Sequence, residues 1–211
     1  MITEITSHIR DINLDILLNK NIFEIDTSKR YKSKIRLFYP NRKLIKYITE
    51  IGGVLTGSRA LRCYTLDKTA ILNRDSDDWD FIVTLDMAYK ILNFKNVNQI
   101  PEINGTISFK NQRYWRHPAY SDSYRVGPVD VQIIIKDELP LYSEKNKIRI
   151  ADISYSINQK IKLINKLEEE LEVKRMYSFT HQTAELSYQI DKHTEDIKNI
   201  IIKINSIKNE I

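Results

Sequence analysis

The 211-residue sequence contains few residues that break or cross-link a chain: one cysteine, five glycines and five prolines. The single thiol, Cys63, excludes an internal disulfide and a zinc site built from paired thiolates, and it is typical of a reducing compartment. The four histidines show no metal-ligand spacing, which disfavours zinc catalysis. No apolar run approaches the roughly 20 residues that span a bilayer, and the first residues lack a signal-peptide pattern. We therefore expect a cytoplasmic protein without a membrane segment.

The composition is that of a folded globular chain, because 42% of the residues are hydrophobic and 29% are charged. The length suits one domain with a helical appendage. Lysine and arginine number 33 against 28 acidic residues, a net charge of +5. This mild excess is compatible with a nucleotide or nucleic-acid partner but does not require one.

Three of the five glycines gather in one short segment, at Gly52, Gly53 and Gly57. Before them, residues 42–51 carry apolar side chains at helical spacing, and residues 54–56 have the character of a short buried strand. The pair Gly57-Ser58 then opens a tight turn before a second helix. A close backbone, a hydroxyl and a helix N-terminus together suit phosphate binding, although ordinary turns also use this pair.

Two acidic residues, Asp78 and Asp80, flank Trp79 at the start of the apolar run 79–84. Side chains alternate across a strand, so the two carboxylates should share one face, with Cα atoms roughly 6 to 7 Å apart. Their oxygens would then converge on one or two hard cations. An acidic, exposed strand end is the alternative interpretation.

A third acid, Asp130, lies within the apolar segment 129–135, where a charge is costly unless it is paired or bound to metal. If this strand pairs with the Asp80 strand, three carboxylates come together. Three acids that hold two Mg²⁺ ions would suit an in-line phosphoryl displacement. A solvated position at the strand entrance is the alternative for Asp130.

The remaining pattern predicts a mixed α/β (α+β) fold over residues 1–150. We expect a weak helix followed by an irregular segment in residues 1–30, a helix at 87–94 capped by Asp86, and short strands at 105–109, 113–116, 124–126 and 129–135. Residues 151–211 form a C-terminal helical region, with one helix from about Ile153 and a second from about Thr180 to Ile207. Together these two helices would form a hairpin. Their apolar stripes would be core contacts or, alternatively, an oligomeric seam.

The order of these motifs resembles the nucleotidyltransferase superfamily, whose catalytic domain is a DNA polymerase beta-like palm. Residues 55–60 (Leu-Thr-Gly-Ser-Arg-Ala) and 78–83 (Asp-Trp-Asp-Phe-Ile-Val) are similar to the two signature segments of its small bacterial and phage members. The lone acid Asp130 fits the third acidic position. The similar region covers residues 42–135, close to half of the chain, and implies a mixed β-sheet core with flanking helices.

The resemblance implies a reaction that depends on two Mg²⁺ ions. A nucleoside monophosphate would pass from a nucleoside triphosphate, such as ATP, to an acceptor hydroxyl, with release of pyrophosphate. Gly57 and Ser58 would hold the triphosphate, and Asp78 and Asp80 would bind both metals. Asp130 would bind the catalytic metal and help to activate the acceptor hydroxyl.

Several further segments have two interpretations each. Arg59 and Arg62 lie one helical turn apart and would neutralise the triphosphate, or they are solvated helix positions. Residues 64–74 look like an inserted hairpin. Residues 109–117 interleave aromatic and basic side chains, as in a nucleic-acid contact or an ordinary hairpin. Residues 191–197 loosely resemble a C-terminal segment of some small members, but a solvated helix face is the favoured interpretation, which leaves Lys192 and His193 outside the predicted site.

The sequence leaves the acceptor open among RNA or tRNA, a protein and a small molecule. A small-molecule transferase of the antibiotic type would require an acidic acceptor pocket, and an RNA or protein modifier a basic one. A different class of function is a phage or defence-system protein that keeps the fold but has lost turnover. Assembly through the C-terminal helices is a further expectation.

Overall fold

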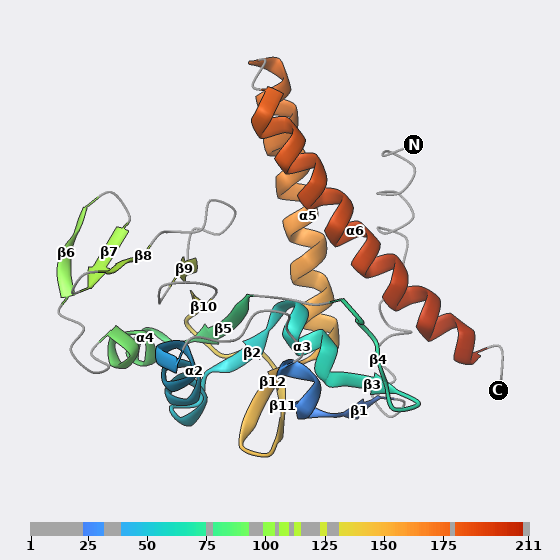
Figure 1. Cartoon of the computed structure of the whole chain (residues 1–211), viewed down its shortest axis with the longest axis horizontal. Coiled ribbons are helices and arrows are strands. Elements are labelled where there is room, and N and C mark those ends of the chain that lie inside the picture. Colours follow the sequence, from blue (N-terminus) through green and yellow to red (C-terminus); the bar gives the residue numbers. More distant parts are fainter. Residues whose placement is uncertain are drawn as a thin grey trace.

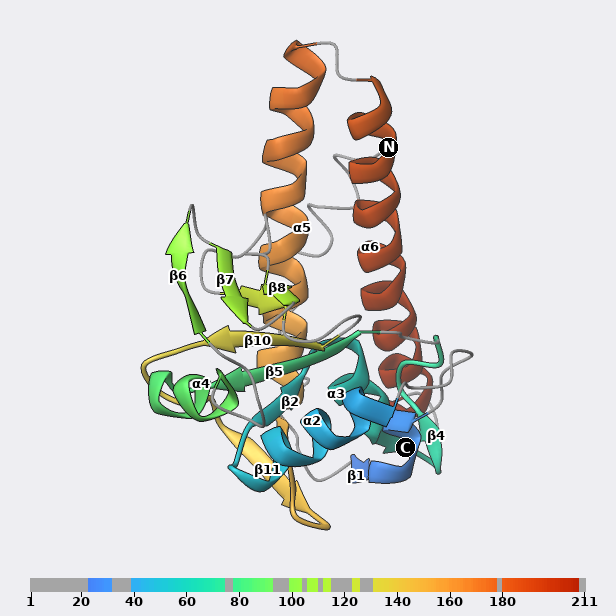
Figure 2. The same ribbon diagram turned by 60° about the vertical axis from the view of Figure 1, so that its left-hand side comes forward.

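The computed structural model describes residues 23–31, 39–74, 78–92, 99–103, 106–109, 112–114, 123–125, 131–177 and 180–208. They form a mixed α/β architecture in which a six-stranded sheet carries short helices, and a long pair of helices, α5 (Ile153–Met176) and α6 (Thr180–Lys208), rises away from it (Figures 1 and 2). Among the described residues, no helix is both long enough and apolar enough to cross a membrane.

The six-stranded sheet has the order β11 (Tyr142–Lys145), β12 (Ile148–Ala151), β2 (Val54–Thr56), β5 (Trp79–Val83), β10 (Val131–Ile135), β9 (Ser123–Arg125). Strand β5 is antiparallel to β2 and parallel to β10. In this register Asp80 is paired with Thr56 on one side and with Gln132 on the other. The centre of the sheet therefore carries a row of three polar residues.

The other described elements surround this sheet. The helical ones are η3 (Thr27–Tyr31), α2 (Tyr39–Glu50), α3 (Gly57–Cys63) and α4 (Leu85–Leu92). One small sheet has the order β1 (Glu24–Ile25), β3 (Tyr64–Leu66), β4 (Thr69–Ala70), and another has the order β6 (Gln99–Ile103), β7 (Thr106–Phe109), β8 (Gln112–Tyr114).

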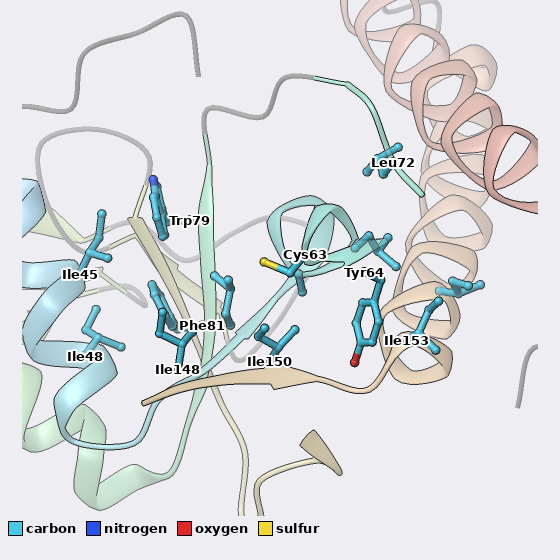
Figure 3. Packing of buried hydrophobic residues seen from close by; sticks show 14 of the residues in the cluster. Ile45, Ile48, Cys63, Tyr64, Leu72, Trp79, Phe81, Ile148, Ile150 and Ile153 are labelled. Carbon is cyan, nitrogen blue, oxygen red and sulfur yellow. The ribbon is translucent and has the colours of Figure 1, made fainter. Parts of the chain in front are cut away.

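The main hydrophobic core lies on one face of the central sheet (Figure 3). Trp79 and Phe81 both enter it, with ring centroids 6.3 Å apart and an interplanar angle of 14°. Ile82 instead belongs to a separate cluster with Val54 and Ala151. This division confirms the predicted alternation along β5, because odd-numbered and even-numbered side chains enter different clusters.

The C-terminal helices are attached to the sheet through the same core and to each other through a second one. Ile153, Ile157, Ile200 and Ile204, at the base of the hairpin, belong to the main cluster. Farther out, the two helices share a cluster made of Ile164, Leu167, Leu171, Ile190 and Ile197. The predicted stripe on α5 is thus a set of core contacts. Asp152 caps this helix by accepting a hydrogen bond from the backbone N–H of Ser154 at 3.0 Å.

The structure confirms the mixed α/β class and the helical hairpin. The predicted helix over 42–51 corresponds to α2, which spans Tyr39–Glu50. The predicted strands at 54–56, 79–84 and 129–135 correspond to β2, β5 and β10, and those at 105–109, 113–116 and 124–126 correspond to β7, β8 and β9. The predicted turn or hairpin within 64–74 is formed by β3 and β4. Two expectations about helix starts differ from the structure. Helix α3 begins at Gly57 itself, without a preceding turn. Helix α4 begins at Leu85. Thr84 rather than Asp86 caps it, because the hydroxyl of Thr84 accepts a hydrogen bond from the backbone N–H of Met87 at 3.5 Å.

Strands β11 and β12 were not predicted. All four residues of β11 are exposed and carry no apolar alternation, whereas Ile148, Ile150 and Ala151 of β12 are buried. The predicted helix near the N-terminus falls mainly on residues 1–22, outside the described residues. The side chains of 109–117 lie outside them as well.

Candidate functional site

A cavity of about 230 Å³ lies where the sheet meets α5 and α6. Strands β2, β5 and β10 contribute residues from one side, and the two helices and Arg74 contribute residues from the other. The polar residues that line it are Thr56, Ser58, Arg74, Asp78, Asp80, Gln132, Tyr155, Ser156, Gln159, Lys160, Gln189, Lys192 and His193, and Gly57, Ile82, Ile134 and Leu163 complete the lining. Four of the predicted site residues, Gly57, Ser58, Asp78 and Asp80, therefore lie in one cavity.

Gly57 is required at this position for two reasons. Its φ is +66°, a left-handed conformation that side chains with a Cβ rarely adopt. In addition, a Cβ placed on Gly57 would overlap the carboxylate of Asp80. The close approach of the start of α3 to β5 thus depends on the missing side chain.

Asp80 on β5 and Asp78 just before it place two negative charges near each other. A bound cation would offset this unfavourable interaction. Burial and the neighbouring charge of Asp78 raise the pKa of Asp80 to about 7, although Lys160, Arg59 and Lys192 act in the opposite direction. A carboxyl group with this pKa is only partly ionised at neutral pH. A divalent cation would favour its ionised form.

The oxygen donors at this end of the cavity fit a magnesium ion. Asp78 and Asp80 supply carboxylates, and Thr56 and Ser156, which also line the cavity, carry buried hydroxyls without a hydrogen-bond partner among the described residues. Carboxylate and hydroxyl oxygens are the ligands that Mg²⁺ prefers. Among the described residues, no group of three or more His, Cys, Asp or Glu side chains could hold a metal ion. The third predicted ligand, Asp130, lies outside the described residues.

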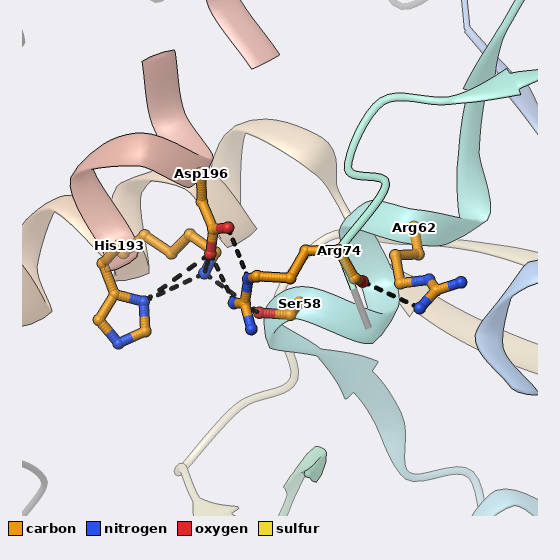
Figure 4. A network of polar contacts seen from close by, with 6 residues as sticks. Ser58, Arg62, Arg74, His193 and Asp196 are labelled. Carbon is orange, nitrogen blue, oxygen red and sulfur yellow. Dashed lines mark hydrogen bonds and ion pairs between the residues drawn. The ribbon is translucent and has the colours of Figure 1, made fainter. Parts of the chain in front are cut away.

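Opposite the acids, a buried network of charges joins four elements of the chain (Figure 4). The ammonium of Lys160, from α5, donates to the hydroxyl of Ser58 at 3.1 Å and to the carboxylate of Asp196, from α6, at 2.8 Å. Arg74 donates to the same two side chains, at 3.0 Å to Ser58 and at 2.6 and 2.7 Å to Asp196. Two cations therefore converge on the hydroxyl that follows Gly57.

The carboxylate of Asp196 remains ionised in this network despite its burial. Burial alone would raise the pKa of Asp196, but the hydrogen bond from Arg74 and the charge of Lys160 outweigh it and hold the pKa below its usual value. Burial lowers the pKa of Lys160, and Asp196 opposes that shift. The buried carboxylate therefore stabilises two cations that would otherwise be costly to place beneath Ser58.

His193 is a neutral member of this network. Burial and the charge of Lys160 lower its pKa to about 3, so the imidazole is uncharged at neutral pH. Its Nδ1 lies 3.3 Å from the ammonium of Lys160. A neutral imidazole whose Nδ1 accepts a hydrogen bond from an ammonium carries its own proton on Nε2. His193 thus has a hydrogen-bond donor in addition to its contact with Lys160.

The structure places Arg59 and Arg62 beside the cavity rather than in its lining. Both side chains are buried. Arg59 donates to the backbone carbonyl of Asp78 at 2.7 Å and lies 4.3 Å from the ring centroid of Trp79. Arg62 donates to the backbone carbonyl of Arg74 at 2.9 Å. The two arginines hold the backbone that positions an acid and a cation of the site.

Sequence reasoning missed five residues of the site: Arg74, Lys160, Lys192, His193 and Asp196. Two signals pointed to them. The segment 191–197 resembles a C-terminal segment of small nucleotidyltransferases, and three of the five residues belong to it. Lys160 also falls between Ile157 and Ile164 on the buried stripe of α5, where a lysine requires a partner.

Comparisons of the chain with protein-family models, with curated proteins and with solved structures find no significant match.

Proposed function

We propose that the chain is a metal-dependent nucleotidyltransferase with a core of the polymerase beta type. It would transfer a nucleoside monophosphate from a nucleoside triphosphate to an acceptor hydroxyl. One observation carries the proposal: a single cavity holds Asp78 and Asp80, the Gly57-Ser58 segment, the buried ammonium of Lys160 and the partly buried guanidinium of Arg74. This combination suits a substrate that brings both polyphosphate and a divalent cation.

The residues divide into two groups by their chemistry. Asp78 and Asp80, together with the predicted ligand Asp130, would hold Mg²⁺, which neutralises phosphate charge and favours the ionised acceptor oxygen. Lys160 and Arg74, which both contact Ser58, would bind the β- and γ-phosphates.

In the reaction, the acceptor oxygen bonds to the α-phosphorus while the bond from that phosphorus to the bridging oxygen breaks. The hydroxyl proton passes to a carboxylate or to water. Pyrophosphate leaves with the negative charge that develops on the bridging oxygen as this bond breaks. The cations of Lys160 and Arg74 lie next to the leaving group and stabilise that charge. These two residues therefore favour both substrate binding and charge development on the leaving group.

The charges of the cavity favour an active enzyme over a binding protein that has lost turnover. They also favour an anionic acceptor over a cationic one. In a binding protein without metal, burial and the neighbouring charge of Asp78 would leave the ionised form of Asp80 costly. Apart from these two acids, the charged residues that line the cavity are Arg74, Lys160 and Lys192. This surface suits RNA or another anionic acceptor better than a cationic antibiotic.

The test is transfer of α-phosphate label from each nucleoside triphosphate, with Mg²⁺, to the protein itself, to RNA or to a host extract. We expect label transfer by the natural chain and its loss in Asp80→Asn, which removes the charge at nearly constant shape. Asp86→Asn, at an exposed position of α4, is the matched control and should retain activity. No transfer by the natural chain, or transfer that survives Asp80→Asn, would contradict the proposal.

A further inference from the structure

Lys192, on α6, differs from the other two cations that line the cavity. Lys160 and Arg74 each contact both Ser58 and Asp196. Among the residues that the structure describes, Lys192 has no hydrogen-bond or ion-pair partner. The cavity therefore presents one cation whose charge no carboxylate of the described chain neutralises by direct contact.

The charge of Lys192 acts on the acids of the cavity. Burial raises the pKa of Asp80, and Lys192 is one of three cations that oppose this shift. Glu195, an exposed acid three residues later on α6, accepts a hydrogen bond from the amide of Asn199 at 3.1 Å. The ammonium of Lys192 is thus available to an anion that binds near the acids.

An exposed aromatic ring lies one helical turn before this ammonium. Tyr188 is 67% exposed, and the i, i+4 spacing places it on the same side of α6 as Lys192. Gln189, which follows it, lines the cavity. Burial lowers the pKa of Arg74, whereas Asp196 and then Tyr188 act to raise it, so the phenol lies on the Arg74 side of the helix. Tyr188 and Lys192 together form a rim of the cavity.

We propose that this rim binds the acceptor of the transfer and that the acceptor is the end of a single-stranded nucleic acid. The inference rests on the proposed function and identifies its second substrate. A nucleic acid supplies both groups that the rim complements, because a phosphodiester suits the ammonium of Lys192 and a base can stack on the ring of Tyr188. Lys192 would repel a cationic small molecule, and an acidic protein would have no base to stack.

The size of the cavity and the exposed ring favour a free single-stranded end. A volume of about 230 Å³ admits the end of a chain but not a duplex, and a duplex hides the base faces that Tyr188 would contact. In the reaction, the terminal sugar hydroxyl bonds to the α-phosphorus, its proton passes to a carboxylate or to water, and pyrophosphate leaves. The new phosphodiester lengthens the strand by one nucleotide.

Fluorescence anisotropy with labelled probes, in Mg²⁺ and without triphosphate, tests the class of acceptor. The probes are single-stranded RNA and DNA oligonucleotides, a blunt duplex and poly-glutamate of equal length. We expect a single strand to bind about ten-fold more tightly than the duplex or poly-glutamate, and the RNA and DNA probes identify the sugar. Single-strand affinity no greater than that of poly-glutamate or of the duplex would overturn the inference.

Substitutions in the rim test the two residues separately. Tyr188→Leu removes the ring but keeps an apolar side chain, so it should weaken single-strand binding about ten-fold, whereas Tyr188→Phe should bind as the natural chain does. Lys192→Gln removes one phosphate contact, so it should weaken binding and reduce the slope of log affinity against log salt by about 0.7.

Two matched variants serve as controls. Tyr177→Leu replaces a tyrosine that is 70% exposed at the C-terminal end of α5, and Lys198→Gln replaces a lysine of intermediate exposure on α6. Neither should change the affinity or the salt slope. Unchanged binding in both Tyr188→Leu and Lys192→Gln, or losses as large in the controls, would overturn the role of the rim.

Calorimetric titration with the α,β-methylene analogues of ATP, GTP, CTP and UTP separates this inference from the proposed function. We expect at least one analogue to bind Tyr188→Leu as tightly as the natural chain. Binding of an analogue but of no oligonucleotide would overturn the acceptor inference and leave the proposed function standing. A loss of analogue affinity in Lys192→Gln that exceeds its loss of oligonucleotide affinity would assign Lys192 to the triphosphate and also overturn the inference. Failure of all four analogues to bind would contradict the proposed function itself.

Discussion

Acidification perturbs the cavity through two buried groups whose effects on stability have opposite signs. His193 has a pKa of about 3 in the folded chain against 6.5 for the ordinary side chain. Below pH 6.5 the unfolded state therefore binds a proton that the folded state does not, and stability is lost as the pH falls. Asp80 has a pKa of about 7 against 3.8. At pH values between 3.8 and about 7 the folded state keeps a proton on Asp80 that the unfolded state has lost, so stability increases as the pH falls.

The two contributions are similar in size. Between pH of about 7.5 and about 5, protonation of the unfolded state at His193 costs about 2 kcal/mol, and protonation of the folded state at Asp80 contributes about 2 to 3 kcal/mol. The side chain of His193 is only 13% exposed, so solvent screening reduces its contribution little. The natural chain should therefore show a nearly flat stability across this range.

Two variants separate the terms. In Asp80→Asn, the free energy of unfolding should fall by about 2 kcal/mol as the pH is lowered, because only the His193 contribution remains. In His193→Gln the free energy of unfolding should rise by about 2 to 3 kcal/mol as the pH is lowered, because only the Asp80 contribution remains.

The assay is urea unfolding followed by circular dichroism in chelator, so that no divalent cation occupies the carboxylates. Asp86→Asn serves as the control and should follow the natural chain. If the stability of His193→Gln follows that of the natural chain at every pH, then His193 is not a buried neutral group and the electrostatic account of the cavity is wrong.

Three further substitutions test the geometry through urea unfolding. Gly57→Ala should lower the free energy of unfolding by at least about 1 kcal/mol, because of its positive φ and its overlap with Asp80; unchanged stability would contradict the close approach. Asp196→Ala should cost about 3 kcal/mol, since it leaves the buried ammonium of Lys160 and the partly buried guanidinium of Arg74 without their carboxylate, and a cost below about 1 kcal/mol would show that the network is solvated. Ile164→Ala should cost about 2 to 4 kcal/mol through a cavity between α5 and α6, whereas Val173→Ala, at an exposed position, should cost less than about 0.5 kcal/mol; equal costs would contradict the hairpin core.

Local patterns in the sequence were sufficient to predict one half of the candidate site. Asp80 lies on β5 and Asp78 directly precedes that strand, so the two-residue period of an extended chain predicts them on one face. The Gly57-Ser58 segment carries its own signal, because a glycine between a buried strand and a helix indicates close backbone approach. The roles of Arg59 and Arg62 could not be predicted in this way. Their partners, the carbonyls of Asp78 and Arg74, depend on how the chain returns to α3.

The sequence by itself determined the mixed α/β class, the apolar stripes of the two C-terminal helices and the pair of acids on β5. These features follow from periodicities of two or about four residues, which act between near neighbours. Only the tertiary structure decided which cations meet those acids. Arg74 and Asp196 are 122 residues apart, and Lys160 and Ser58 are 102 residues apart. Such pairs form because the hairpin packs its base into the core of the sheet, and a polar residue on a predicted helix does not reveal in advance which buried charge it will meet.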